Sequence, residues 1–155
     1  MIVFLHWVGW AIWLGAQLTF MVWGPVAKRL PLEAWAYTWD TLSKIQRWIV
    51  APAAAVATVT GIVLSMQYAQ RDTPEGASLG ATWLIVMQSL GLLAGIMTLA
   101  LATPLVNRLA FLAAKSIESG TQDERAEPVR RKLALVASIS GVFILVSLYF
   151  SAVKP

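Results

Sequence analysis

Residues 76–107 read GASLGATWLIVMQSLGLLAGIMTLALATPLVN and contain no charged side chain. A helix needs about 20 mainly apolar residues to cross the roughly 30 Å hydrocarbon core of a bilayer. Three more runs meet this condition: residues 1–27, where His6 is the only ionisable side chain, residues 48–70 and residues 133–153. We therefore expect an all-α polytopic membrane protein, a bundle of four transmembrane helices at about 2–26, 48–69, 82–106 and 133–153.

The composition agrees with this class of protein. Only 13% of the 155 residues are charged and 58% are hydrophobic, whereas soluble domains carry about 25% charged residues. The chain has no cysteine, which excludes disulfides, thiolate metal sites and iron–sulfur clusters. We expect residues 1–155 to form one membrane domain in contact with lipid. The first run has no basic leader, so we expect it to be retained as a helix.

The positive charges are distributed unevenly. Ten of the twelve Lys and Arg residues lie between the first and second runs or between the third and fourth, and only Arg71 and Lys154 lie elsewhere. Cytoplasmic loops are enriched in Lys and Arg, so we expect both termini outside. The net charge of +4 thus reflects membrane orientation, and no nucleic-acid partner is expected. Residues 31–47 predict an amphipathic connector on the inner membrane surface, with its Trp side chains at headgroup depth.

Small residues recur at helical spacing in the last three runs. In lipid, helices associate through close backbone approach at such residues, so this pattern predicts a compact bundle. The residues are Ala53, Ala57, Gly61 and Ser65, then Gly91 and Gly95, then Ala134 and Ser138 with Ala137 and Gly141 beside them.

His6 is the only histidine, and it begins a stripe that continues through Trp10, Trp13 and Gln17. Each residue of an α-helix advances about 100°, so these four side chains share one face of the first helix. A polar side chain at membrane depth is costly unless it is paired or used. His6 is therefore the best candidate for a functional residue, and Gln17 is expected to hydrogen-bond a neighbouring helix.

Other side chains reach the level of His6 if the four helices alternate in direction. Met66 and Gln67 lie at the end of the second helix, and Met87 and Gln88 lie about one and a half turns into the third. At about 1.5 Å per residue, His6 and Gln88 both lie within about 10 Å of the outer boundary. A polar cluster of His6 and Gln88, with Gln67 as a further candidate, is geometrically allowed.

Three interpretations of His6 stay open. In the first, His6 is an axial ligand of haem b, with Trp10 and Trp13 packed against the porphyrin and Gln88 beside it. In the second, His6 binds copper together with methionines such as Met66 and Met87, because thioethers suit Cu(I). In the third, His6 only hydrogen-bonds a neighbouring helix or a lipid headgroup.

Several elements of the sequence resemble a known family. The first helix has Leu5-His6 followed by Trp13-Leu14-Gly15, Phe20 and Pro25, the second begins at Arg47 and contains Thr58, Thr60 and Gly61, and the fourth ends Val153-Lys154-Pro155. This pattern is similar to the CopD-like integral membrane superfamily. That superfamily includes the copper-resistance D domain, the HemJ-type protoporphyrinogen oxidases and many small four-helix proteins.

The resemblance implies a four-helix protein of the bacterial inner membrane whose first-helix histidine, here His6, ligates haem. HemJ-type oxidases also need a lysine in the third helix, and Gln88 stands at that place. Glutamine neither carries that charge nor titrates, so oxidase activity is not implied and enzymatic function stays open. The CopD-type relatives imply copper handling as an alternative. A non-catalytic subunit of a larger membrane complex, or a homo-oligomer, is the third possibility.

Overall fold

The computed structural model describes residues 1–69 and 81–153, and all regular structure within these ranges is helical. Four helices are long and apolar enough to cross a membrane, which confirms the predicted all-α class and the four-helix bundle. In chain order the elements are α1 (Ile2–Ala27), α2 (Leu32–Ile45), η1 (Gln46–Val50), α3 (Ala51–Ala69), α4 (Thr82–Ile96), η2 (Met97–Ala102), α5 (Thr103–Ser119) and α6 (Ala126–Val153).

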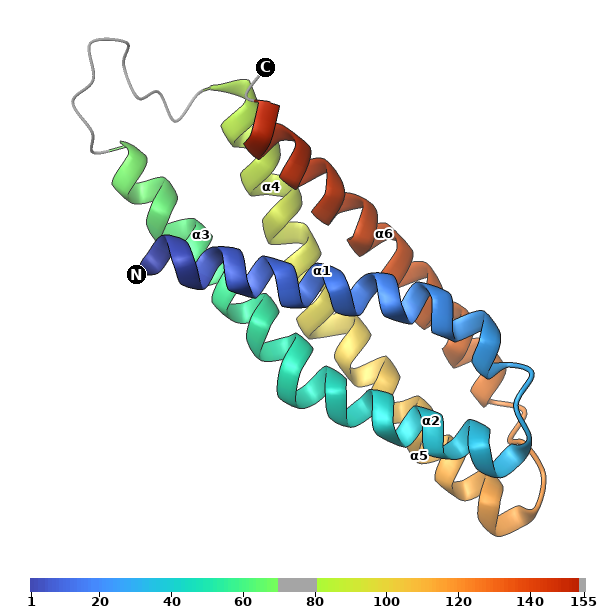
Figure 1. Cartoon of the computed structure of the whole chain (residues 1–155). Helices are drawn as coiled ribbons and strands as arrows, with labels where there is room; N and C mark the ends of the chain where they lie inside the picture. Colours follow the sequence, from blue (N-terminus) through green and yellow to red (C-terminus); the bar gives the residue numbers. More distant parts are fainter. Residues whose placement is uncertain (70–80, 154–155) are drawn as a thin grey trace.

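The elements form four rods, because α2, η1 and α3 are continuous, as are α4, η2 and α5 (Figure 1). The start of α1 and the end of α6 lie at one end of the bundle, here termed the His6 end (Figure 1). The connections at 28–31 and 120–125 lie at the opposite end, here termed the basic end. Near the basic end α2 packs along α5, whereas α3 and α4 spread apart toward the His6 end (Figure 1).

The residues of the expected connector at 31–47 do not form a separate helix. They begin a single helix, Leu32–Tyr68, that continues into the second apolar run. Trp35 and Trp39, each only 3% exposed, are buried in a core with α5 and α6, and the position of this segment at the inner membrane surface stays a prediction. No glycine or proline interrupts the chain between Ile45 and Ala51, so the helix continues, and its apolar stripe meets α5 rather than lipid. Two other helices of this core are α5 and α6. The first ends at Ser119, and the second begins at Ala126 rather than near residue 133.

The two rods built from three elements, α2–η1–α3 and α4–η2–α5, each contain one π-helical segment, and each segment lies just before a proline. η1 ends two residues before Pro52, and η2 ends two residues before Pro104. A proline inside a helix lacks an N–H and its ring clashes with the carbonyl four residues back, and a widened π turn accommodates this clash. The Gln46 side chain donates a hydrogen bond from Nε2 to Thr103 Oγ1 at 3.0 Å, which joins the two segments. The prolines thus widen the helices without ending them.

Small residues bring the helices close together in the His6 half. A Cβ atom on Gly9 would lie 2.9 Å from the carbonyl oxygen of Ala53 and 3.1 Å from the Cβ atom of Ala57. Gly95 of α4 meets Thr58 of α3 in the same way, since its Cβ would lie 2.6 Å from Thr58 Oγ1. The predicted packing role of small residues in α3 and α4 is therefore confirmed.

The packing face of α6 differs in part from the expected one. Ala137, Ser140 and Gly141 are buried, and a Cβ on Gly141 would overlap the Met21 side chain of α1. Ala134 and Ser138, the other small pair in this helix, are exposed. The two pairs lie on different faces of one helix, and spacing alone does not show which face meets the bundle.

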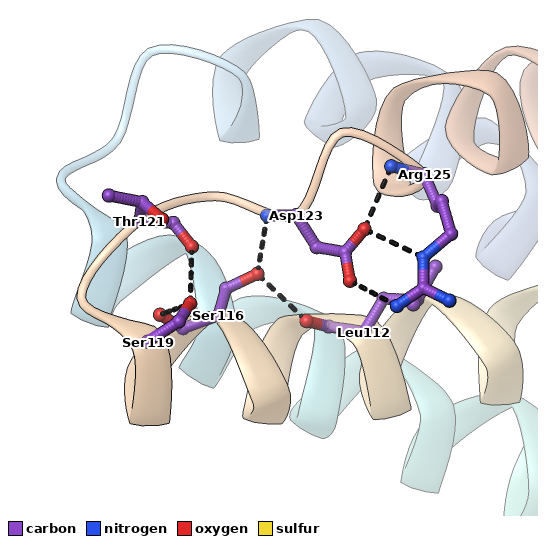
Figure 2. A network of polar contacts seen from close by, with 6 residues as sticks. All are labelled: Leu112, Ser116, Ser119, Thr121, Asp123 and Arg125. Carbon is purple, nitrogen blue, oxygen red and sulfur yellow. Dashed lines mark hydrogen bonds and ion pairs between the residues drawn. The ribbon is translucent and has the colours of Figure 1, made fainter.

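Side-chain hydrogen bonds close the connection between α5 and α6 at the basic end (Figure 2). Gly120, with φ of 73°, ends α5 in the left-handed conformation that glycine adopts readily. Ser116 Oγ accepts the backbone N–H of Asp123 at 2.9 Å and donates to the Leu112 carbonyl at 2.8 Å. The guanidinium and backbone N–H of Arg125 donate to the Asp123 carboxylate at 2.7–3.0 Å, and these hydrogen bonds lower the pKa of Asp123 to about 2.

Substitution of Gly9 tests the contact between α1 and α3. We expect Gly9→Ala to lower the free energy of unfolding by about 1–3 kcal/mol, because the new methyl group overpacks against the α3 backbone. Denaturant titration in detergent micelles, followed by circular dichroism, measures the change. Gly15→Ala is the matched control, since a Cβ there meets nothing within 4 Å, and it should leave stability unchanged or slightly raised. Equal effects of the two substitutions would contradict this packing.

Acid should weaken the α5–α6 connection through Asp123. Its pKa is depressed from 3.8 to about 2 in the folded protein, so its contribution to stability is present above about pH 4 and is lost as the pH falls to about 2. We expect Asp123→Asn to be less stable than the wild type at pH 5, with the difference shrinking toward pH 2. Unfolding curves between pH 2 and 5 measure this, with Glu124→Gln as the neighbouring control. A difference that is independent of pH would count against the Asp123–Arg125 pair.

Candidate functional site

A cavity of about 690 Å³ occupies the His6 half of the bundle, where α3 and α4 spread apart. Its wall is mainly apolar and comes from α1, α3, α4 and α6. At its outer limit the rings of Tyr68 and Trp83 meet edge to face, with centroids 5.9 Å apart, and link α3 to α4. The wall contains all six side chains that the sequence singled out for a cofactor or metal: His6, Trp10, Trp13, Met66, Met87 and Gln88.

Both ring nitrogens of His6 have hydrogen-bond partners. Nδ1 lies 2.9 Å from the carbonyl oxygen of Ala57 and 3.0 Å from Thr60 Oγ1. A carbonyl oxygen only accepts hydrogen bonds, so Nδ1 carries the proton and Nε2 is left with its lone pair. That lone pair accepts the indole N–H of Trp10 at 3.0 Å. His6 is therefore a neutral imidazole whose tautomer is fixed by α3 on one side and by Trp10 on the other.

Gly61 allows the imidazole to lie against α3. A Cβ atom at this position would lie 3.0 Å from His6 Cε1 and 3.7 Å from Nδ1. The sequence indicated Gly61 and Ala57 as packing residues, and it did not indicate that the backbone carbonyl of Ala57 binds the ring. Gln67, the further candidate for the polar cluster, is exposed and lies outside the cavity wall.

Trp10 and Trp13 extend the His6 stripe across the bundle. Their ring centroids are 5.3 Å apart with planes inclined by 34°, and the His6 ring meets Trp10 edge to face at 6.0 Å. A Cβ on Gly91 of α4 would lie 3.7 Å from the Trp10 ring, so the indole reaches from α1 to the α4 backbone. Trp13 is fully buried. Trp10 is the indole with surface exposed in this part of the wall, and Trp13 packs against it at an angle.

A chain of buried hydrogen bonds lies beyond Trp13. Trp13 Nε1 donates to Thr98 Oγ1 at 3.1 Å, and Thr98 Oγ1 lies 3.2 Å from Ser140 Oγ. Ser140 Oγ donates to the Ala94 carbonyl at 3.4 Å and accepts the Gln17 side-chain amide at 3.2 Å. The predicted role of Gln17 in joining helices is confirmed, since the chain connects α1 with α4, η2 and α6.

The donors available for a metal are few. In the described ranges 1–69 and 81–153, no group of three or more His, Cys, Asp or Glu side chains lies together. Met66 and Met87 are in the same wall as His6, but Met66 is 61% exposed at the outside of the bundle. Gln88 Nε2 is buried and has no hydrogen-bond partner among the described residues. Because an unpaired buried amide costs free energy, a ligand or water that accepts its hydrogen bond would stabilise this wall.

The chain matches no family model, and no curated protein or solved structure is similar to it. The resemblance to the CopD-like superfamily therefore stays a prediction. The cavity offers one fixed imidazole, two indoles in tilted contact, one buried amide and a few hydroxyl groups in a mainly apolar wall. Such a site suits a flat apolar ligand that offers one coordination position.

Loss of the Ser140 hydroxyl tests the hydrogen-bond chain that holds Trp13. We expect Ser140→Ala to lower the free energy of unfolding by about 1–2 kcal/mol, near the upper limit for hydrogen bonds between membrane helices, because Gln17 and Thr98 both lose a partner. Chemical unfolding in micelles measures the loss. Ser138→Ala removes an exposed hydroxyl from the same helix and should have little effect. A stable Ser140→Ala variant would show that the chain does not hold the helices together.

Proposed function

We propose that this protein binds haem b, or a related porphyrin, in the cavity at its His6 end, with His6 Nε2 as an axial ligand. The main support is the single imidazole of fixed tautomer in the wall of a mainly apolar cavity of about 690 Å³. Cavities of about 300–1,000 Å³ with a few well-placed polar groups are usual for small molecules and cofactors. The core between packed helices is also a common place for a cofactor.

The surroundings of His6 suit a metal-binding imidazole. Histidines that bind metals usually donate their other N–H to a carbonyl or carboxylate, which orients the ring and raises its basicity. The Nδ1–H of His6 makes this kind of hydrogen bond with Ala57. Trp10, supported by Trp13, offers an apolar surface for a porphyrin, and Gln88 offers an N–H donor. Met66 and Met87 in the same wall, or a side chain of another chain, would be the further donors to the iron.

The role that we propose for the bound haem is a redox or accessory one. It does not include oxidation of a substrate with the help of acid–base catalysis. When bound, the iron porphyrin supplies one-electron chemistry. His6 would hold the iron, while the indoles and α3 would exclude water from it. Among the described residues, no lysine, arginine or carboxylate lines the cavity, so that part of the chain offers no strong acid or base there. This composition favours electron transfer or haem handling over a HemJ-type reaction.

We also propose which end of the bundle faces the cytoplasm. The connections at 28–31 and 120–125 and the neighbouring helix ends carry most of the Lys and Arg residues, and the positive-inside rule supports a basic end that faces the cytoplasm. A bacterial inner membrane is the location that the family resemblance implies. The cavity would then lie near the outer leaflet. Apolar side chains on the outward faces, such as Val22 and Val59, would contact the lipid.

The absorption spectrum of the protein purified in detergent tests the proposal. We expect a Soret band in the wild type, and at least a 10-fold lower ratio of haem to protein in His6→Ala, because the variant loses its iron ligand, and even loss of a supporting residue costs about 10–100-fold in metal affinity. Gln67→Ala is the control, since this exposed side chain lies at the same end but outside the wall. Circular dichroism would establish that both variants are folded.

Other results would favour the alternatives. A colourless wild-type protein with one copper per chain would support copper handling, which the positions of Met66 and Met87 in the His6 wall favour. A colourless, metal-free protein that co-purifies with a larger membrane complex would support the role of a non-catalytic subunit. A Soret band retained in His6→Ala would contradict the assignment of the ligand.

A further inference from the structure

The Trp10 indole uses the only lone pair that His6 has for a metal. Trp10 lies one helical turn after His6 in α1, and its Nε1–H donates to His6 Nε2 at 3.0 Å. The other ring nitrogen carries the proton that is donated to the Ala57 carbonyl. A nitrogen lone pair accepts a hydrogen bond or coordinates a metal, but does not do both. In the arrangement described here, His6 is therefore masked.

The surroundings of Trp10 leave room for the indole to move. The ring packs at a tilt against Trp13 and lies in van der Waals range of Gly91. On the remaining side it borders the cavity of about 690 Å³. Rotation of the indole into the cavity would break the hydrogen bond to Nε2, while Ala57 and Gly61 would still hold the imidazole in place.

We propose that Trp10 is a gate for His6: its indole masks the imidazole in the ligand-free protein and moves away when a large apolar ring enters the cavity. The assignment of that ring as a porphyrin rests on the function proposed above, whereas the mask itself rests on the hydrogen bonds. The gate makes the site selective. A free metal ion must break the Trp10 hydrogen bond and gains only one imidazole, while a flat macrocycle also buries apolar surface against the wall.

Trp10→Phe removes the indole N–H and keeps an aromatic ring, so it should unmask His6. Acylation of the single histidine by diethyl pyrocarbonate, which attacks an unprotonated imidazole nitrogen, reports the mask without any haem. We expect acylation to be about 2- to 10-fold faster in ligand-free Trp10→Phe, the range set by the net strength of one hydrogen bond. Trp23→Phe is the matched control because Trp23 lies in the same helix, is 41% exposed and is outside the cavity wall.

Titration with haemin separates the gate from the function. Tighter binding by Trp10→Phe, again by about 2- to 10-fold, together with faster acylation supports both. Faster acylation with no haemin binding by either protein supports the mask and overturns the haem proposal. Equal acylation of Trp10→Phe and Trp23→Phe overturns the mask. Faster acylation with unchanged haemin affinity overturns the gate, because the mask would then not limit ligand entry.

If the Trp10→Phe variant folds poorly, a measurement on the wild-type protein still tests the gate. With ¹⁵N-labelled histidine and tryptophan in micelles, the single histidine gives one pair of ring-nitrogen signals. We expect a scalar coupling across the hydrogen bond between His6 Nε2 and Trp10 Nε1–H. We also expect the Nδ1 signal of a protonated nitrogen. A histidine with the proton on Nε2, or no coupling to tryptophan, would overturn the gate directly.

Discussion

The arrangement of this bundle depends on the need to pair polar groups inside an apolar medium. Within a hydrocarbon layer no water is available to satisfy an N–H, an O–H or a ring nitrogen, so a partner on a neighbouring helix strongly stabilises such a group. The polar stripe of α1 finds its partners in three directions. His6 binds α3, Trp13 binds η2 and Gln17 binds α6. These bonds fix the rotation of α1 about its own axis and thereby decide which side chains face the cavity.

The two halves of the molecule are held together by different means. At the basic end, bulky side chains such as Trp35, Trp39 and Leu109 form a continuous core between α2, α5 and α6. In the His6 half, close backbone contacts at glycine, alanine and hydroxyl groups accompany a smaller core around Trp10, Trp13 and Ile144. The space left between the rods is larger in this half, about 690 Å³ against about 220 Å³ near the basic end. The cavity is thus a consequence of where the large residues are placed.

Much of this structure could be predicted from periodicity and charge. The four apolar runs gave the helices, and the spacing of His6, Trp10 and Trp13 together with the depth of Gln88 identified one wall of the cavity. The packing of residues 31–47 against α5 could not be foreseen, because an amphipathic stripe has the same sequence pattern whether it faces lipid or another helix. The partners of His6 could not be foreseen, since the Ala57 carbonyl belongs to the backbone and every residue has one. Gln67 was misplaced because depth in the membrane does not determine the face of a helix.

The matched π-helical segments before Pro52 and Pro104 have a consequence for how such a protein can diversify. The rods α2–η1–α3 and α4–η2–α5 both contain a π-helical segment at the same level, and the hydrogen bond between Gln46 and Thr103 connects the two rods there. Mutations between this hydrogen bond and the His6 end can alter the angle between α3 and α4 while the core at the basic end stays as it is. A lineage that keeps the hydrogen bond between Gln46 and Thr103 could therefore acquire binding sites of different sizes by small heritable steps, without having to evolve a new fold for each.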